Sequence, residues 1–261
     1  MNFGKLLGEG LFGKVYESHW KGIKIVIKVL KQSGFHNEGA KRSFASEVRT
    51  LGKTQHINLV RLLGYCIKGL KHMLVYEYMS NKSLDEWLSD DKLLNWNKRT
   101  SIIVGVAQGL KYLHHTCNPI IIHLDIKPGN ILLDEDYTPK LADFGLAKIL
   151  KPNNENVVSA NSTPGSIGYM APEIRQESKQ RHVSPKCDVY SFGVLLIELV
   201  NGSQFILDRH KTRKFIQWAQ KLPVQKDGFQ QIFDAIIKNS IVGFNSDEAK
   251  LLLEISLECI Q

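Results

Sequence analysis

The sequence predicts an α+β fold in two parts, a small part built on an antiparallel sheet and a larger, mainly helical part. The first observation is a series of strand-like segments within the first 79 residues. The second is a change, from residue 80 onward, to apolar residues at helical spacing. The third is a pair of polar turns between short apolar strands, at residues 121–133 and 140–146. We therefore expect one domain with two parts, residues 1–79 and 80–261.

Composition is that of an ordinary soluble globular chain, with 261 residues, 43% hydrophobic and 23% charged. The net charge of +8 permits an acidic partner, but lysine and arginine are spread along the chain. The densest basic cluster, Arg209–Lys214, is interpreted as a solvated loop face, so no nucleic-acid partner is expected. No apolar run reaches the roughly 18 residues needed to span a bilayer. The four cysteines form no Cys-x-x-Cys pair, which favours free thiols.

A glycine-rich loop opens the chain within Leu7–Val15 and has the spacing Gly-x-Gly-x-x-Gly. Alone this string is weak evidence, because dinucleotide-binding folds use it before a helix. Here Lys14–Trp20 has strand composition, and Ile23–Leu30 alternates as a second strand after a turn. The loop therefore joins two antiparallel strands. Lys28 lies on the next strand, where a phosphate-binding lysine is needed; the alternative is an ordinary lysine at a strand edge.

Residues 40–52 are predicted to form a helix with Phe44, Val48 and Leu51 along one apolar stripe. Glu47 lies on the inward side of this stripe. An inward glutamate needs a cation, and Lys28 is the obvious candidate. The alternative is a glutamate that is solvated at the margin of the stripe.

Two further strands, Asn58–Cys66 and His72–Met79, complete a five-stranded antiparallel sheet with one helix. Ser83–Glu86 forms a capping box that starts the helical part. Asn95 is a candidate N-cap for a long helix. The buried stripe of this helix comprises Ile103, Val106, Ala107, Leu110 and Leu113.

Two segments follow the polar turns. Lys151–Gly168 is rich in Asn, Ser, Pro and Gly and is predicted to be a long mobile loop. Asp188–Val200 is almost continuously apolar, which predicts a helix buried on all sides.

The polar turn after Ile121–Ile122 carries His123, Asp125, Lys127 and Asn130, and the apolar strand Ile131–Leu133 follows it. Buried polar groups need partners, so four such side chains between apolar runs indicate a turn that faces a charged ligand. The second turn repeats this design, because a short strand delivers Asp143 beside a glycine.

Together these features resemble the protein kinase family. The motifs shared with it, in its order and spacing, are the glycine loop, Lys28, Glu47, His123–Asn130, Asp143–Gly145 and Ala171–Glu173. The segments Val75–Asp85, Gly168–Glu173 and Asp188–Gly193 are most similar to plant receptor-like kinases, related to the animal Pelle and interleukin-receptor-associated kinases. The resemblance covers essentially the whole chain and implies a bilobal kinase fold, with residues 1–79 as the N-lobe and 80–261 as the C-lobe.

The resemblance implies a role for each polar group. Lys28, held by Glu47, would grip the α- and β-phosphates of ATP. Asn130 and Asp143 would hold Mg²⁺, with Mn²⁺ as an alternative. Asp125 would accept or orient the proton of the incoming hydroxyl, and Lys127 would offset charge on the γ-phosphate. A lysine two residues after the aspartate resembles the serine/threonine branch of the family.

The resemblance also implies an adenine site between the lobes. The backbone of Glu77 and Met79 would bond the ring, with Tyr76 as a bulky gatekeeper behind it. The apolar side chains that would sandwich the ring are Leu7, Val15, Val26 and Leu132, for which a purely structural core role is the alternative. The backbone of Gly8, Gly10 and Gly13 would cover the phosphates, since glycine allows close approach.

Several positions depart from the family pattern. Leu124 stands where many kinases have an arginine that receives a phosphorylated activation loop, so we expect activity to depend little on phosphate at Ser159, Ser162 or Thr163. Val26 replaces the usual alanine and predicts modest nucleotide affinity. Ser166 replaces a threonine but keeps a hydroxyl that could bond Asp125.

Two expectations concern the whole protein. The chain stops before an arginine that pairs, in the family, with the glutamate corresponding to Glu173, so we expect a truncated C-terminus. The expected function is ATP-dependent phosphorylation of serine or threonine hydroxyls on protein substrates, in the cytoplasm at the face of the plasma membrane if the parent protein is a receptor. The alternative is a pseudokinase that serves as a binding or scaffold module.

Overall fold

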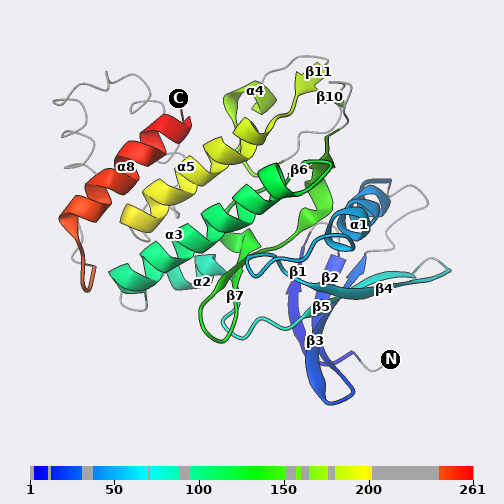
Figure 1. The fold of residues 1–261 in the computed structure, drawn as a ribbon. Coiled ribbons are helices and arrows are strands. Elements are labelled where there is room, and N and C mark those ends of the chain that lie inside the picture. Colours follow the sequence, from blue (N-terminus) through cyan, green and yellow to red (C-terminus); the bar gives the residue numbers. More distant parts are fainter. Residues whose placement is uncertain are drawn as a thin grey trace.

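The computed structural model describes residues 3–10, 13–30, 38–69, 71–88, 94–150, 157–159, 165–175, 180–201 and 241–260. Its N-terminal part is an antiparallel sheet of five strands in the order β1-β2-β3-β5-β4 (Figure 1). The strands are β1 (Leu6–Glu9), β2 (Gly13–Trp20), β3 (Ile23–Leu30), β4 (Leu62–Lys68) and β5 (Lys71–Glu77). The predicted five-stranded sheet is therefore confirmed.

The hairpin of β2 and β3 forms as predicted because its turn residues accept positive φ angles. Lys21 has φ +50° and Gly22 has φ +79°, which suits the tight turn of a two-residue hairpin. The alternation of β3 then separates two faces. Ile25 and Ile27 are buried with Met73 on one face, whereas Lys28 belongs to the opposite face.

The fourth strand begins later than the sequence indicates, at Leu62 rather than Asn58. The stretch before it pairs instead with β8 (Pro139–Leu141): Val60 donates to the Leu141 carbonyl at 2.9 Å, and the Leu141 N–H donates to the Asn58 carbonyl at 2.9 Å. The Asn58 side chain also donates to the Pro139 carbonyl at 2.9 Å. These contacts join segments far apart in the chain, 81 residues for Asn58 and Pro139, and tie the sheet to the helical part.

The helix α1 (Glu38–Leu51) confirms the predicted helix and lies beside the sheet (Figure 1). Phe44 and Leu51 are buried in the same apolar cluster as Leu74 of β5. The helix α1 also packs against η3, a short 3-10 turn over Phe144–Leu146, whose Phe144 belongs to the same cluster. The helix is thus placed between the sheet and the turn that follows Asp143.

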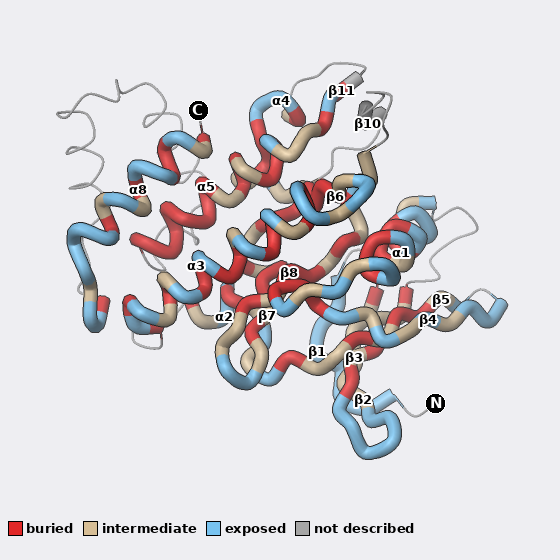
Figure 2. The backbone as a smooth tube through the Cα atoms, viewed as in Figure 1, coloured by how far each residue is buried: buried red, intermediate tan, exposed pale blue. Residues whose placement is uncertain are grey.

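The helical part is built around α5 (Pro185–Asn201), in which most residues are buried (Figure 2). This confirms the helix predicted from Asp188–Val200. Its neighbours are α3 (Trp96–Lys111) and α8 (Ser246–Ile260), both packed against it. Among the described residues, further helical segments include α2 (Leu84–Leu88), the π-helical turn η1 (Tyr112–Thr116) and α4 (Pro172–Arg175).

The start of α3 is capped as expected, because the Asn95 side chain accepts a hydrogen bond from the Lys98 N–H. Along the predicted stripe, Val106 and Leu110 are buried, whereas Ala107 is half-buried. Among the described helices, none is both long and apolar enough to cross a bilayer.

Two small two-stranded sheets flank the two polar turns. β6 (Ile121–Ile122) pairs with β9 (Lys148–Ile149), and β7 (Ile131–Leu133) pairs with β8. A 3-10 turn, η2 (Pro128–Asn130), precedes β7. Both polar turns therefore lie where the sheet meets the helical part.

The segment predicted as a long loop contains a short strand. β10 (Val157–Ser159) pairs with β11 (Gln180–His182). Ser162, Thr163 and the basic cluster Arg209–Lys214 lie outside the described residues.

Candidate active site

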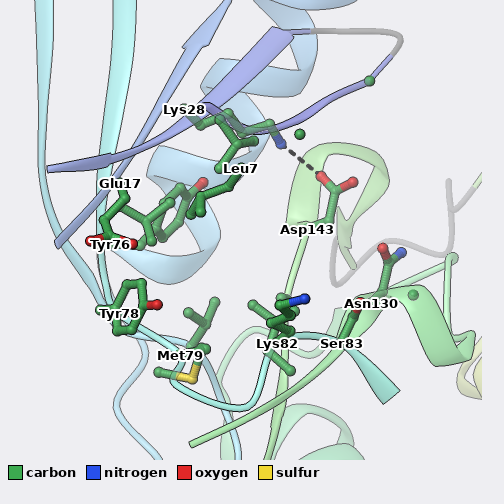
Figure 3. Close-up of a pocket in the computed structure, with 18 of the residues that line it drawn as sticks. Leu7, Glu17, Lys28, Tyr76, Tyr78, Met79, Lys82, Ser83, Asn130 and Asp143 are labelled. Atoms are coloured by element: carbon green, nitrogen blue, oxygen red, sulfur yellow. Dashed lines mark hydrogen bonds and ion pairs between the residues drawn. The ribbon is translucent and has the colours of Figure 1, made fainter. Parts of the chain in front are cut away.

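The centre of the site is a lysine that contacts two carboxylates. Lys28 Nζ lies 2.6 Å from Glu47 Oε1 and 2.9 Å from Asp143 Oδ1. The three residues come from β3, α1 and the turn after β8. Figure 3 shows Lys28 and Asp143 pointing toward each other across the cleft. The predicted ion pair between Lys28 and Glu47 is confirmed, and the alternative of a solvated glutamate is wrong.

Burial and charge act in opposite directions on the pKa values of this cluster. Burial alone would lower the pKa of Lys28, but the charges of Glu47 and Asp143 outweigh it and raise the pKa. Burial would raise the pKa of Asp143, but the Lys28 ammonium holds it below its usual value. For Glu47 burial dominates, and its pKa is raised despite Lys28. Lys28 is therefore a firmly protonated cation beside an ionised Asp143.

A second contact holds Glu47 from the other side. The hydroxyl of Tyr76 donates a hydrogen bond to Glu47 Oε2. Both side chains are buried, and burial raises the pKa of Tyr76, so the phenol stays protonated as a donor. Each oxygen of the buried Glu47 carboxylate thus has a donor.

The turn of residues 123–130 converges on Asp125. Asn130 Nδ2 donates to Asp125 Oδ2 at 2.7 Å, and Lys127 Nζ lies 2.9 Å from the same oxygen. Ser166 Oγ donates to Asp125 Oδ1 at 2.8 Å and accepts from Lys127 Nζ at 2.6 Å. The expected bond from Ser166 to Asp125 is therefore confirmed. One hydroxyl, one amide and one ammonium orient the Asp125 carboxylate.

The backbone of this turn is anchored by Asp188 of α5, which lies fully buried beneath it. Asp188 accepts from the N–H groups of His123 and Leu124, each at 2.8 Å, and contacts His114 Nε2 at 2.8 Å. Asp188 thus ties helix α5 to the backbone of the turn that carries Asp125. His114 takes part in this anchor through its contact with Asp188. Among the described residues, no cluster of three or more His, Cys, Asp or Glu side chains could hold a metal.

Leu124 has a left-handed backbone, with φ +67°, which is unfavourable for a branched residue. Its side chain is buried in an apolar cluster with Ile122, Met170 and Cys187. The position that carries arginine in many kinases is therefore part of the core here. Nothing in this packing offers a cation to a phosphorylated loop.

A cleft of about 640 Å³ joins these groups. Its lining includes every residue expected to bind nucleotide or metal: Leu7, Gly8, Gly10, Gly13, Val15, Val26, Lys28, Tyr76, Glu77, Met79, Leu132, Asn130 and Asp143. Glu47 also lines it. Asp125 and Lys127 are not among the lining residues, but Asn130 connects Asp125 to the cleft.

Sequence reasoning missed several residues of this cleft, including Glu86. Four others that it missed, Glu17, Tyr78, Lys82 and Ser83, are labelled in Figure 3. Ser83 and Glu86 were assigned only to a helix start. The signal that could have found them is their position just after the segment Glu77–Met79. The helix α2 begins at Leu84, so both residues lie at the edge where the sheet meets the helical part.

The oxygen atoms of the site suit a hard divalent cation. Lys28 donates a hydrogen bond to Asp143 Oδ1, and the amide nitrogen of Asn130 donates to Asp125. Asp143 and Asn130 therefore each have an oxygen that can bind a metal in the cleft. Two protein oxygens with phosphate and water are the usual ligands of Mg²⁺. The donor set fits a metal that arrives with a nucleotide.

Comparison with known sequences shows the family to which this fold and this cleft belong. The chain matches the protein kinase domain over residues 1–259. It therefore belongs to the protein kinase family, whose members use ATP with a divalent metal to phosphorylate proteins.

The relatives are plant receptor-like kinases, as the resemblance implied. The chain is 37% identical over its full length to a leaf rust 10 disease-resistance locus receptor-like protein kinase-like protein of Arabidopsis thaliana, covering 39% of that protein. It is 43% identical over 84% of its length to a G-type lectin S-receptor-like serine/threonine-protein kinase of the same plant, covering 25%. Identity to the leucine-rich repeat receptor protein kinase EMS1 is 47%, over 76% of this chain and 16% of that protein. The chain thus spans less than half of each of these relatives.

Proposed function

We propose that this chain is an active serine/threonine kinase domain that transfers phosphate from Mg-ATP to a protein hydroxyl. The observation that carries the proposal is the double contact of Lys28 with Glu47 and Asp143. Kinase activity requires both the lysine–glutamate pair and the metal-binding aspartate to be in place. The domain would divide into lobes at residues 79 and 80, with the nucleotide between them.

In this proposal the chain acts mainly by positioning and by neutralising charge. Lys28, held by Glu47, binds the α- and β-phosphates, and Asp143 and Asn130 hold Mg²⁺. The metal would supply charge neutralisation at the phosphates. The backbone of Gly8, Gly10 and Gly13 covers the phosphates, and the ring lies among Leu7, Val15, Val26 and Leu132.

Residues around the ring and the acceptor complete the scheme. Glu77 and Met79 present backbone groups to the adenine, with Tyr76 behind them. Asp125 orients the incoming hydroxyl and takes its proton, and its carboxylate is held ready by Asn130 and Ser166. Lys127 lies beside Asp125, where its charge offsets that of the transferred phosphoryl group.

A labelled-ATP transfer assay tests this proposal. Lys28→Met and Asp143→Asn should each abolish transfer to a serine- or threonine-containing protein, whereas Lys24→Met, on the exposed part of the same strand, should retain it. Phosphoamino-acid analysis of the product reports serine/threonine specificity. Equal signal in all variants would mean a contaminating kinase. Nucleotide binding without transfer by the native chain would instead identify a pseudokinase.

The receptor context is also a proposal. It is supported by the printed names of the relatives and by the small share of each that this chain covers. We propose that the parent protein is membrane-anchored and that this domain acts at the cytosolic face of the plasma membrane. Microscopy of the full-length parent protein carrying a fluorescent tag tests this, since a uniform cytosolic signal would contradict it.

A further inference from the structure

Helix α1 and the turn that follows Asp143 approach each other more closely than larger side chains would allow. A Cβ added at Gly145 would collide with Ser43 Oγ and would lie 3.2 Å from Ser43 Cβ. Ser43 and Ser46, one helical turn apart, are both buried. The two segments are thus in near-backbone contact.

One hydrogen bond between α1 and this segment fixes their relative position. Ser46 Oγ donates to the carbonyl oxygen of Ala147 at 2.8 Å, in a buried environment. The N–H of Ala147 is used within the turn, where it donates to the Phe144 carbonyl at 3.1 Å. Ser46 therefore binds Ala147, the C-cap residue that directly follows the 3-10 turn Phe144–Leu146.

The turn needs such support because Asp143 has an unfavourable backbone. Its φ of +62° and ψ of +68° lie in the left-handed region, which a residue with a Cβ keeps only when its surroundings hold it. Three polar side-chain contacts support the turn. His123 Nε2 contacts the Ala142 carbonyl at 3.0 Å before Asp143, Lys28 contacts Asp143 itself, and Ser46 holds Ala147 after it. Of these three, the contact from Ser46 connects the turn to α1.

We propose that Ser46 is a positioning residue that couples α1 to the turn carrying the metal-binding Asp143. Ser46 directly precedes Glu47, so a shift of the turn relative to the helix would prevent Lys28 from contacting Glu47 and Asp143 together. Apolar contact alone has no preferred direction and would allow sliding. The inference rests on the proposed function, since that proposal makes Asp143 the metal ligand.

The test compares two variants that each remove one buried hydroxyl from α1. Ser46→Ala removes the bond to Ala147. Thr50→Val is the matched control, because Thr50 Oγ1 donates at 2.7 Å to the Ser46 carbonyl within the same helix. Phosphate transfer is measured against Mg²⁺ concentration, and thermal unfolding is measured in parallel.

We expect Ser46→Ala to lower kcat by about tenfold and to raise the Mg²⁺ concentration at half-saturation several-fold. The reason is that loss of the Ser46 bond would let the turn shift and displace Asp143, the proposed metal ligand. Thr50→Val should stay within about twofold of the native enzyme in both quantities. An unchanged Mg²⁺ dependence in Ser46→Ala, or an equal change in both variants, would overturn the proposal.

A measurement without substrate separates this inference from the proposed function. If the native chain transfers no phosphate, the proposed function fails, and hydrogen exchange decides the role of Ser46. Faster amide exchange over residues 143–147 and in α1 in Ser46→Ala, but not in Thr50→Val, supports the coupling. Equal exchange in the two variants rejects it.

Discussion

Tyr76 donates its hydroxyl hydrogen to Glu47, the same carboxylate whose other oxygen contacts Lys28 at 2.6 Å. The strand β5 thereby fixes the glutamate of α1 while β3 supplies its cation. Two strands and one helix meet at a single buried carboxylate, which is 1% exposed. Tyr76 is thus part of the polar network as well as of the wall of the cleft.

Tyr76→Phe should destabilise the domain because Glu47 Oε2 would lose its donor in a buried site. The expected loss is about 1–3 kcal/mol in the free energy of unfolding, measured by urea denaturation. Tyr78→Phe is the control, since Tyr78 lines the same cleft two residues later. Equal effects of the two substitutions would show that the Tyr76 hydroxyl contributes nothing specific.

Gly145→Ala should impair activity because its Cβ would collide with Ser43 Oγ. We expect a loss of about tenfold in kcat. Adding Ser43→Ala removes the colliding atom and should restore most of the loss, an interaction that a double-mutant cycle measures. Gly64→Ala is the control, because a Cβ there meets nothing within 4 Å. Failure of Ser43→Ala to rescue would show that the clash lies elsewhere.

Because of the buried carboxyl of Glu198, we expect the free energy of unfolding to depend on pH. Burial raises the pKa of this carboxyl from 4.5 to about 7, although Tyr169 donates to it at 2.6 Å. Between these values the folded state binds a proton that the unfolded state releases. The free energy of unfolding therefore falls as pH rises through this window, by up to about 3 kcal/mol, and the loss is complete above the folded pKa.

Urea denaturation at several pH values between 5 and 8 tests this dependence. Glu198→Gln cannot ionise, so its stability should fall less steeply with rising pH than that of the native chain. Glu254→Gln, at an exposed position of α8, should behave like the native chain. Parallel pH profiles for the native chain and Glu198→Gln would contradict the raised pKa.

Treatment with a phosphatase should change kcat/KM by less than about tenfold, because Leu124 provides no cation for a phosphate on the loop. Its side chain is 5% exposed and lies within an apolar cluster. Alanine at Ser159, Ser162 and Thr163 together serves as the matched variant. A drop of tenfold or more on dephosphorylation, reproduced by this variant, would show that another cation receives the phosphate.

Much of the fold follows from local pattern. The alternation of Ile23–Leu30, the cap at Asn95 and the continuous apolar run of Asp188–Val200 each have a local physical cause, and each element forms where the sequence indicates. The start of β4 does not. Asn58 and Val60 have the pattern of strand residues but form hydrogen bonds with β8. The Asn58 side chain, for example, bonds Pro139, which lies 81 residues later in the chain.

The candidate site divides in the same way. Lys28, Asp125 and Asp143 could be predicted as site residues from their motifs, because charged groups among apolar residues need partners. The donation from Tyr76 to Glu47 and that from Ser46 to Ala147 could not. Each joins segments whose separation along the chain, 29 and 101 residues, leaves no local trace.

The sequence by itself determined which side chains are candidates for the site and on which kind of element each one lies, since strand alternation, helix spacing and turn residues act over a few neighbours. Only the tertiary structure decided how those elements are locked together: Tyr76 on Glu47, Ser46 on Ala147, and Asp188 beneath His123 and Leu124. The reason is that a buried donor or acceptor takes whichever partner the packed chain brings within reach.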